Sequence, residues 1–415
     1  MSDPASIDVA IVGGGPAGIA AALALRARGV ERVTILEREQ VAGGVPRHCG
    51  HPPFGMREFH RLLSGPAYAE KLRQAAQDAG VDIRLNTTVT ALHPSGRLAI
   101  TTPVGTSDVS ARRVILATGA REMSRAGRLM TGDRPVGVIT TGTLQQSIYI
   151  EHLKPFRRPV IVGTELVSLS AALTCWKAGI RPVAIVEMAL RPTARRPLDL
   201  FPRLLGIPTH YGADVIDIKG RSRVEAVTLR LSDDSTRELA CDGVLLTGRF
   251  LPESALVRLS HLGLDQGSGG PLIDQFGRCS DPSYFAAGNL LRPIETAGWS
   301  FREGSRIGAV VADDLDGRLP AAERMIAIAR GAGLKLTVPQ YIALPSAKAC
   351  LEQIQLRAEA SGTGVLKAES GGRVLWQKRM SVLPERRILL PLAALLKAGG
   401  TMETISISFN KDEGR

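Results

Sequence analysis

The fold is decided by the stretch Asp8-Val-Ala-Ile-Val-Gly-Gly-Gly-Pro-Ala-Gly18, near the start of the chain. Its apolar first half has the length of a buried strand and runs into three spaced glycines, Gly13, Gly15 and Gly18. An Ala- and Leu-rich segment of helical period follows, and a second apolar run then ends at Glu37, 24 residues after Gly13. This order of strand, glycine turn, helix and strand predicts a βαβ unit that binds an adenine dinucleotide.

Each of these residues has a physical role in such a site. Gly13 allows a tight turn out of the strand, Gly15 lets the backbone approach a pyrophosphate, and Gly18 lets the helix lie close to the sheet. The helix N-terminus offers unpaired N–H groups and the positive end of the helix dipole to the phosphates. The Glu37 carboxylate is expected to accept hydrogen bonds from the adenosine ribose. The alternative is an ordinary glycine-rich strand-to-helix turn without a ligand.

Composition and charge narrow the class of protein. The 415 residues are 44% hydrophobic and 22% charged, which is typical of a globular protein with two or three domains. Residues 1–4 lack the features of a signal peptide, and no apolar run reaches the ~18 residues of a membrane span. We therefore expect a cytoplasmic protein whose membrane association is peripheral at most. The net charge of +12 indicates a solvated basic surface, or one that attracts an acidic partner, an anionic substrate or a membrane. No motif supports nucleic-acid binding.

The cysteines occur singly, without a Cys-x-x-Cys pair. This pattern indicates a reducing compartment and argues against a disulfide framework. It also argues against a zinc or iron–sulfur centre formed by this chain alone. The five are Cys49, Cys175, Cys241, Cys279 and Cys350.

A second copy of the opening pattern begins at Pro159 and again ends in a carboxylate, Glu187, 24 residues after Gly163. Here the second and third glycine positions are Glu165 and Ser168. A carboxylate where the backbone should meet a pyrophosphate is both a steric block and a like charge. We therefore expect this repeat to keep the fold and to bind a nicotinamide nucleotide weakly or not at all. In the alternative, Glu165 points away and binding survives at lower affinity.

Beyond Pro320 the composition shifts. A short helix is expected up to Arg330, and runs of alternating apolar residues follow, separated by turn signals at 361–362, 371–372 and 399–400. This pattern predicts a small β-rich domain of about 80 residues. It contains no histidine and no phosphate-binding loop, so we expect it to serve in packing or in subunit contacts.

The chain combines two predicted, nested βαβ units with an Ala-Thr-Gly strand end at 117–119 and an Ala-Ala-Gly-Asn element at 286–289. In these features it resembles the two-dinucleotide-binding-domain flavoproteins, which include the thioredoxin and glutathione reductases. The resemblance implies an α/β fold with two nested Rossmann-like dinucleotide-binding domains plus a small C-terminal β-rich domain. It implies an FAD-binding domain formed by residues 1–125 and 240–320 and an inserted NAD(P)-binding-like domain at 126–239. The C-terminal domain is then residues 330–415.

The same resemblance implies that FAD is the cofactor and that the motif residues hold it. Asn289 stands where these flavoproteins have an aspartate that contacts the ribityl and phosphate portion, so hydrogen bonding is kept and the charge is lost. The residues expected to bind FAD are Gly13, Gly15, Pro16, Ala17, Gly18, Glu37, Arg38, Gly43, Gly44, Val45, Ala117, Thr118, Gly119, Gly288 and Asn289.

Longer strings resemble a narrower group, the flavoprotein subunits of heteromeric dye-linked dehydrogenases. This group includes subunits of hydrogen cyanide synthase, D-hydroxyproline dehydrogenase, opine oxidase and heteromeric sarcosine oxidase. The resemblance covers roughly residues 7 to 315 and implies an FAD-dependent subunit that relays electrons from a substrate-oxidising flavoprotein partner subunit. Because this chain lacks the cysteine-rich C-terminal region of some relatives, a [2Fe-2S] cluster would lie on a separate small subunit. The strings are 43–51, 54–58, 64–69, 120–122, 132–135, 287–293 and 295–299.

Six residues are expected to line and tune the flavin, since a nearby cation favours its reduced, anionic form. They are Arg47, His48, Cys49, His51, Trp299 and Glu303. In the structural alternative, the two histidines brace their loop and Glu303 pairs with Arg302 or Arg306. Two further alternatives make Cys49 a reactive thiolate, as in peroxidase-like flavoproteins, or a metal ligand with the histidines. We predict no metal site.

Two alternatives to the dehydrogenase-subunit prediction stay open. The first is a free-standing NAD(P)H-dependent flavin reductase, which requires the segment 163–165 to bind a nicotinamide nucleotide. The second is a scaffold subunit that binds an adenine nucleotide without flavin. Purified protein that oxidises NADH alone would select the first, and colourless protein with bound nucleotide would select the second.

Overall fold

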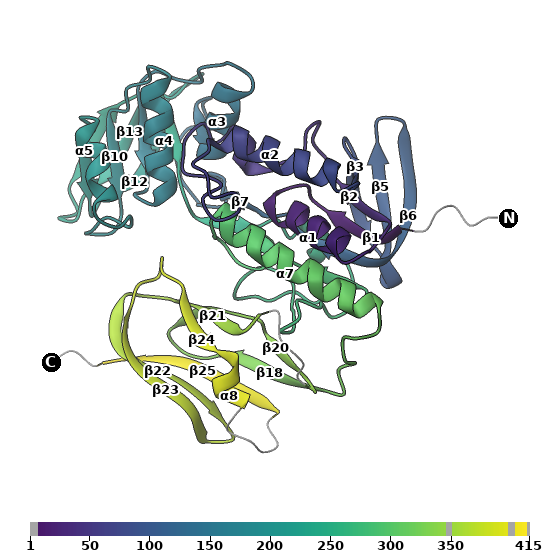
Figure 1. Ribbon diagram of the computed structural model, residues 1–415. Coiled ribbons are helices and arrows are strands. Elements are labelled where there is room, and N and C mark those ends of the chain that lie inside the picture. Colours follow the sequence, from purple (N-terminus) through teal and green to yellow (C-terminus); the bar gives the residue numbers. More distant parts are fainter. Residues whose placement is uncertain (1–6, 346–350, 397–402, 413–415) are drawn as a thin grey trace. The chain divides into compact units, whose positions relative to one another are not determined.

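A computed structural model describes residues 7–345, 351–396 and 403–412 (Figure 1). The chain forms two compact units. The first contains Met1–Gly44, Ala69–Ala120 and Pro252–Arg415, and the second contains Val45–Tyr68 and Arg121–Leu251. The predicted FAD-binding domain included residues 45–68, 121–125 and 240–251, which group here with the second unit. The C-terminal strands, predicted as a separate domain, group with the first unit. Cys350 and the turn expected at 399–400 lie outside the described residues.

The first unit is built on a mixed sheet with the strand order β3-β2-β1-β6-β5-β4, in which β17 also pairs with β6. Parallel pairs join β3, β2, β1, the second half of β6 and β17, and antiparallel pairs join β4, β5 and the first half of β6. All residues of β1 are buried, as expected for a central parallel strand. The bounds are β1 (Ile7–Val12), β2 (Val33–Leu36), β3 (Asp82–Arg84), β4 (Thr88–Leu92), β5 (Arg97–Thr102), β6 (Gly105–Leu116) and β17 (Tyr284–Ala286).

Helices α1 and α7 of this unit lie in close contact because glycines face the backbone of α1. A Cβ at Gly304 would lie 2.0 Å from the carbonyl oxygen of Ala17, and one at Gly308 would lie 2.4 Å from that of Ala21. The bounds are α1 (Pro16–Ala27), α6 (Ala255–Arg258) and α7 (Ala297–Leu315), with the 3-10 helices η2 (Pro94–Gly96) and η4 (Gly288–Leu290). Helix α2 (Gly65–Asp78) begins in the second unit and ends in the first.

The second unit contains a parallel sheet with the order β11-β10-β9-β15-β8 and an antiparallel sheet with the order β12-β13-β14. Alternate residues of the parallel strands point to opposite faces. Ile161 and Ile185 pack with the helices α3 and α4, whereas Val160 and Val186 pack with the antiparallel sheet. The parallel strands are β8 (Val138–Thr140), β9 (Pro159–Val162), β10 (Ala184–Glu187), β11 (Thr209–Tyr211) and β15 (Gly243–Leu246).

The remaining elements of this unit include the antiparallel strands β12 (Asp214–Lys219), β13 (Ala226–Arg230) and β14 (Thr236–Ala240). Its helices are α3 (Thr141–Tyr149), α4 (Leu166–Lys177) and α5 (Phe201–Leu204), with the 3-10 helices η1 (Val45–His48) and η3 (Leu198–Leu200). The short strands β7 (Ala120–Glu122) and β16 (Phe250–Pro252) pair with each other.

The C-terminal part of the first unit consists of two sheets with the orders β20-β18-β25-β22-β23 and β19-β21-β24 around a shared apolar core. The short helix expected up to Arg330 is wrong, because this segment is strand β18, in which Ile326 and Ile328 are buried and Met325 is exposed. The bounds are β18 (Arg324–Arg330), β19 (Leu334–Val338), β20 (Tyr341–Leu344), β21 (Gln353–Ala358), β22 (Gly362–Ser370), β23 (Arg373–Val382), β24 (Ile388–Pro391), α8 (Leu392–Leu396) and β25 (Thr404–Lys411). The predicted α/β class with a β-rich C-terminal region is confirmed.

Among the described residues, no helix combines the length and apolar character that a membrane crossing requires.

Candidate cofactor site

The turn between β1 and α1 has the geometry of a phosphate-binding loop. Gly13 has a φ of +110°, and a Cβ there would lie 2.6 Å from the carbonyl oxygen of Ala117. A Cβ at Gly18 would lie 2.0 Å from the carbonyl oxygen of Gly13. Both positions therefore require glycine. Helix α1 starts at Pro16 without an acidic residue in its first turn, so its first N–H groups can bind an anion.

A second glycine loop closes on this turn. Gly43 donates its N–H to the carbonyl oxygen of Gly14 at 2.7 Å. Gly44 has a φ of +64°, and a Cβ there would lie 2.9 Å from the Cα of Gly15. A Cβ at Gly15 would meet only the Cα of Gly44, at 3.8 Å. The two loops thus present backbone without side chains along the path that a dinucleotide pyrophosphate would take, and the residues present fit FAD.

The Glu37 carboxylate is fixed beside this turn. Its side chain is buried, with Oε2 accepting the N–H of Gly14 at 2.8 Å and Oε1 accepting the N–H of Glu39 at 2.9 Å. A carboxylate has about four acceptor positions, so it can also accept ribose hydroxyls. Arg38 and Val45, by contrast, are exposed.

The strand end at 117–119 is held by the first residues after β16. Thr118 donates its hydroxyl to the carbonyl oxygen of Glu253 at 2.8 Å, and Glu253 donates its N–H to the carbonyl oxygen of Gly119 at 2.9 Å. Ala117 extends the ladder by donating its N–H to Val12. These contacts keep the carboxyl end of β6 next to the glycine turn.

Gly288 follows β17 and packs against the start of α1. It has a φ of +75°, and a Cβ there would lie 2.8 Å from the Cβ of Ala17. Its N–H donates to Glu303 Oε2 at 2.9 Å. Glu303 also forms a two-point ion pair with Arg292, with distances of 2.9 Å and 2.8 Å, and both side chains are buried. Glu303 thus pairs with Arg292, rather than with Arg302 or Arg306 as in the structural alternative.

The amide of Asn289 holds a loop closed. Its Oδ1 accepts the N–H of Glu295 at 2.7 Å, and its Nδ2 donates to the carbonyl oxygen of the same residue at 3.1 Å. Trp299, at the start of α7, has two cations near its ring: the guanidinium carbon of Arg387 is 4.0 Å from the ring centroid and that of Arg302 is 5.2 Å away. The predicted site residues 288, 289, 299 and 303 are therefore brought together around one turn.

The loop with Arg47, His48, Cys49 and His51 belongs to the second unit, where η1 contains the first two residues. The thiol of Cys49 is buried and lies 3.5 Å from Gln145 Oε1. Burial, and then the charge of Glu122, raise the pKa of Cys49 to about 12. Burial and this raised pKa argue against the alternative of a reactive thiolate. The ring of His51 contacts Phe54, and its Nδ1 lies 2.9 Å from the carbonyl oxygen of Pro52.

Two residues of this region were not predicted as site residues, although one of them, Glu122, belongs to the string 120–122. Glu122 accepts the N–H of Gly142 at the start of α3 at 2.8 Å, and burial raises the pKa of its carboxyl. Gln145 joins Cys49 to Ser170. A carboxylate three residues after the strand end at 117–119 is a sequence signal that points to Glu122. No sequence signal points to Gln145. Among the described residues, no group of three or more His, Cys, Asp or Glu side chains could hold a metal ion.

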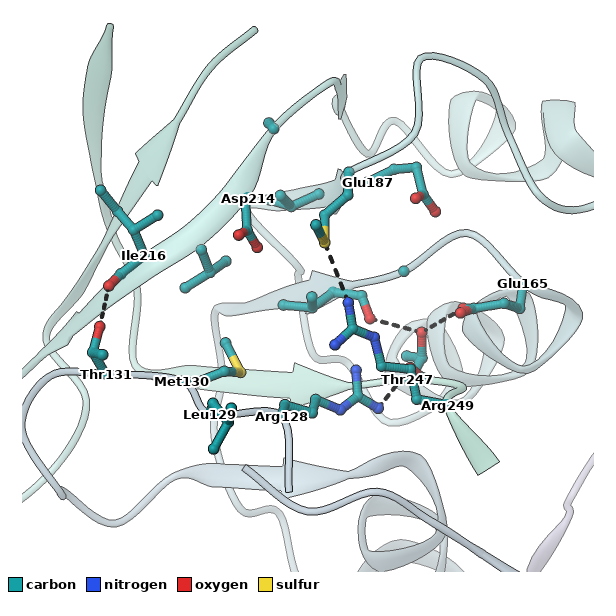
Figure 2. Close-up of a pocket in the computed structure, with 16 residues that line it drawn as sticks. Arg128, Leu129, Met130, Thr131, Glu165, Glu187, Asp214, Ile216, Thr247 and Arg249 are labelled. Carbon is teal, nitrogen blue, oxygen red and sulfur yellow. Dashed lines mark hydrogen bonds between the residues drawn. The ribbon is translucent and has the colours of Figure 1, made fainter. Parts of the chain in front are cut away.

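The second glycine turn lines a cavity of about 480 Å³ in the second unit, shown in Figure 2. Glu165 lies between two glycines, because Cβ atoms at Gly163 and Gly248 would lie 2.4 Å and 2.2 Å from its carboxylate oxygens. Its Oε2 accepts the hydroxyl of Thr247 at 3.0 Å. Burial, and more weakly the neighbouring Glu187, raise the pKa of Glu165.

The two βαβ units repeat each other in their contacts. As Gly43 donates to Gly14 in the first, Ala194 donates its N–H to the carbonyl oxygen of Thr164 at 3.0 Å in the second. The residues that follow these hydrogen-bonded pairs are Gly15 and Gly44 in the first βαβ unit, and Glu165 and Arg195 in the second. The carboxylate of Glu187 accepts from Thr164, as that of Glu37 accepts from Gly14. The second unit therefore keeps the fold and places two side chains where the first has none.

These features agree with a family model described as pyridine nucleotide-disulphide oxidoreductase, which matches residues 7–304. The chain belongs to this family. Its members bind FAD, and the chain is accordingly an FAD-dependent oxidoreductase. The family match therefore favours FAD over the scaffold alternative without flavin.

Individual relatives are moderately similar. The ferredoxin reductase component of a chlorobenzene dioxygenase from Cupriavidus sp. is 29% identical, over 72% of this chain and 69% of its own length. The HcnB subunit of hydrogen cyanide synthase from Pseudomonas aeruginosa is 29% identical, over 62% of this chain and 59% of its own length. An opine oxidase subunit from Agrobacterium tumefaciens is 24% identical, over 76% of this chain and 64% of its own length. The chain thus spans less than two thirds of the latter two.

A solved structure, the thioredoxin reductase of T. acidophilum, matches with a TM-score of 0.62 and 22% identity, over 74% of this chain and 98% of that one. It supports the predicted two-dinucleotide-binding-domain fold. The predicted similarity to hydrogen cyanide synthase and opine oxidase subunits is confirmed, and that to D-hydroxyproline dehydrogenase and sarcosine oxidase stays a prediction.

Proposed function

We propose that this chain is the FAD-bearing subunit of a multi-subunit dehydrogenase that acts on an amine, an amino acid or an opine. It receives electrons from a substrate-oxidising flavoprotein subunit rather than from NAD(P)H. The observation that carries the proposal is the Glu165 carboxylate at the second glycine turn. The relatives whose names denote subunits of hydrogen cyanide synthase and opine oxidase support it.

The Glu165 side chain opposes a nicotinamide nucleotide in two ways. Its carboxylate occupies the space between Gly163 and Gly248. A Cβ atom at either glycine would lie within 2.4 Å of a carboxylate oxygen of Glu165. When ionised, it also repels a pyrophosphate. The hydroxyl of Thr247 lies 3.0 Å from Glu165 Oε2, which supports this position of the side chain over the alternative in which it points away. Arg128, whose guanidinium donates to the carbonyl oxygens of residues 247 and 248, reduces this repulsion only in part.

FAD supplies the redox chemistry when bound, and the residues of this chain bind and orient it. The backbone around Gly15 and Gly44 receives the pyrophosphate, and Glu37 receives the adenosine ribose. Gly288 and Asn289 contact the ribityl and phosphate portion. A small [2Fe-2S] subunit completes the complex, which is cytoplasmic with peripheral membrane association at most.

The test is anaerobic reduction of the purified, FAD-loaded chain by NADH and by NADPH, followed by the visible flavin absorbance. We expect neither nucleotide to bleach the flavin, whereas dithionite bleaches it fully. The Glu165→Gly variant should bind NADH measurably more tightly. Asp214→Gly is the matched control, since it removes another carboxylate that lines the same cavity but lies on β12. Rapid bleaching of the unmodified chain by NADH would overturn the proposal.

A second candidate is an NAD(P)H-dependent ferredoxin reductase. It is favoured by the relative from the chlorobenzene dioxygenase system and by the retained carboxylate of Glu187 beside an open cavity. It requires Glu165 to leave the turn when the nucleotide binds. Bleaching by NADH, followed by electron transfer to an added [2Fe-2S] ferredoxin, would select this function.

A further inference from the structure

The C-terminal strands contact the turn at Gly288 through one buried glutamine. Gln355, on β21, accepts the Nε–H of Arg292 at 2.9 Å. Gln355 is 9% exposed and Arg292 is 3% exposed, so water does not replace this contact. A buried guanidinium that loses an acceptor keeps an unsatisfied charged donor, which is costly.

Arg292 in turn holds the backbone of Gly288. Its Nη1 donates to the carbonyl oxygen of Gly288 at 3.1 Å and to Glu303 Oε2 at 2.9 Å. The same oxygen of Glu303 accepts the N–H of Gly288. The N–H of Gly288 is thus held by Glu303, and its carbonyl oxygen accepts from Arg292 as well as from the N–H of Leu291 at 3.1 Å. The Arg292–Glu303 pair is in turn connected to the C-terminal domain by Gln355.

A second contact ties the following loop to the same domain. Glu295 accepts from Arg387 at 3.0 Å and from Arg357 at 3.3 Å, and all three side chains are largely buried. The backbone of Glu295 is in turn held by the amide of Asn289. Arg387 also lies over the ring of Trp299. Gly288 and Asn289, which are expected to contact the ribityl and phosphate portion of FAD, are thus both connected to the C-terminal part of the chain.

We infer that the C-terminal domain is a positioning element of the FAD site, and that Gln355 is a positioning residue acting through Arg292 on Gly288. The domain keeps the turn in its FAD-binding conformation before the cofactor arrives, which lowers the ordering cost of binding. The inference rests on FAD contact at residues 288 and 289 and is independent of the electron donor. It therefore fails separately from the proposed function.

The test is the dissociation constant of FAD, measured by titrating the full-length apoprotein and following flavin fluorescence. Gln355→Leu removes the acceptor at similar volume and should weaken FAD binding roughly tenfold. Gln355→Glu keeps an acceptor oxygen for Arg292 and should restore binding to within about twofold of the unmodified chain.

The matched control is Gln340→Leu. Gln340 is also a buried glutamine and lies between β19 and β20, but its Oε1 accepts the N–H of Ile273, and none of its described hydrogen bonds joins it to Arg292 or Gly288. It should lower stability to heat without weakening FAD binding. Unchanged binding in Gln355→Leu would overturn the inference. So would equal weakening by Gln340→Leu, or by Gln355→Glu, because the effect would then be a general loss of stability.

Discussion

The buried Arg292–Glu303 pair offers the sharpest test of how the cofactor site is stabilised. Replacing Arg292 by methionine removes both hydrogen bonds to Glu303 as well as those to Gly288 and Gln355. Methionine fills much of the volume, so the main effect is a carboxylate left buried without its cation. Such a loss costs about 3–5 kcal/mol of the free energy of unfolding.

The double variant Arg292→Met, Glu303→Gln separates charge from packing. Glutamine keeps an acceptor for the N–H of Gly288 and carries no charge, so we expect the double variant to recover about half of the lost stability. The assay is urea unfolding of the apoprotein followed by circular dichroism, with the midpoints compared at equal slopes.

The control is Arg97→Met, which breaks an ion pair with Asp108 that is about half exposed on both sides. It should leave the midpoint unchanged within error. The reasoning is refuted if Arg292→Met lies within about 1 kcal/mol of the unmodified chain, or if the double variant is no more stable than the single one.

Three further outcomes are expected. Gly18→Ala should destabilise the apoprotein by about 1–3 kcal/mol or prevent folding, since its Cβ would lie 2.0 Å from a backbone oxygen. Gly15→Ala, whose Cβ would meet nothing closer than 3.8 Å, should keep the stability of the apoprotein and weaken FAD binding. Equal unfolding midpoints for the two apoprotein variants would contradict this. Cys49 should not react with a disulfide reagent at pH 8 in the folded protein, because its pKa of about 12 keeps the thiol protonated. In urea, where the thiol is no longer buried, it should react fully. Fast labelling of the folded chain would contradict this by showing an accessible thiolate. Burial raises the pKa of Glu165, so its ionisation destabilises the folded state as the pH rises above the pKa of the unfolded chain. Glu165→Gln should therefore increase the free energy of unfolding more at pH 8 than at pH 4. A larger increase at pH 4 would contradict the direction of this pKa shift.

Much of the first glycine turn could be predicted from the sequence. Gly13, Gly18 and Glu37 follow local rules: a strand that turns into a helix over a phosphate needs small residues at fixed spacing and a carboxylate at the next strand end. The second copy was recognisable for the same reason, and the position of Glu165 in it follows from counting residues. The C-terminal strands were visible as alternating apolar runs, although β18 was mistaken for a helix because seven residues contain too few periods to separate the two patterns.

The tertiary structure alone decided which distant residues meet. The pairing of Arg292 with Glu303, and the support of Arg292 by Gln355 from 63 residues further along the chain, depend on how β21 packs against the turn after β17. The raised pKa of Cys49 depends on its burial and on the nearby Glu122, which no local pattern encodes. Sequence spacing determines backbone conformation over a few residues, whereas burial and side-chain partners are properties of packing between elements that are far apart in the chain.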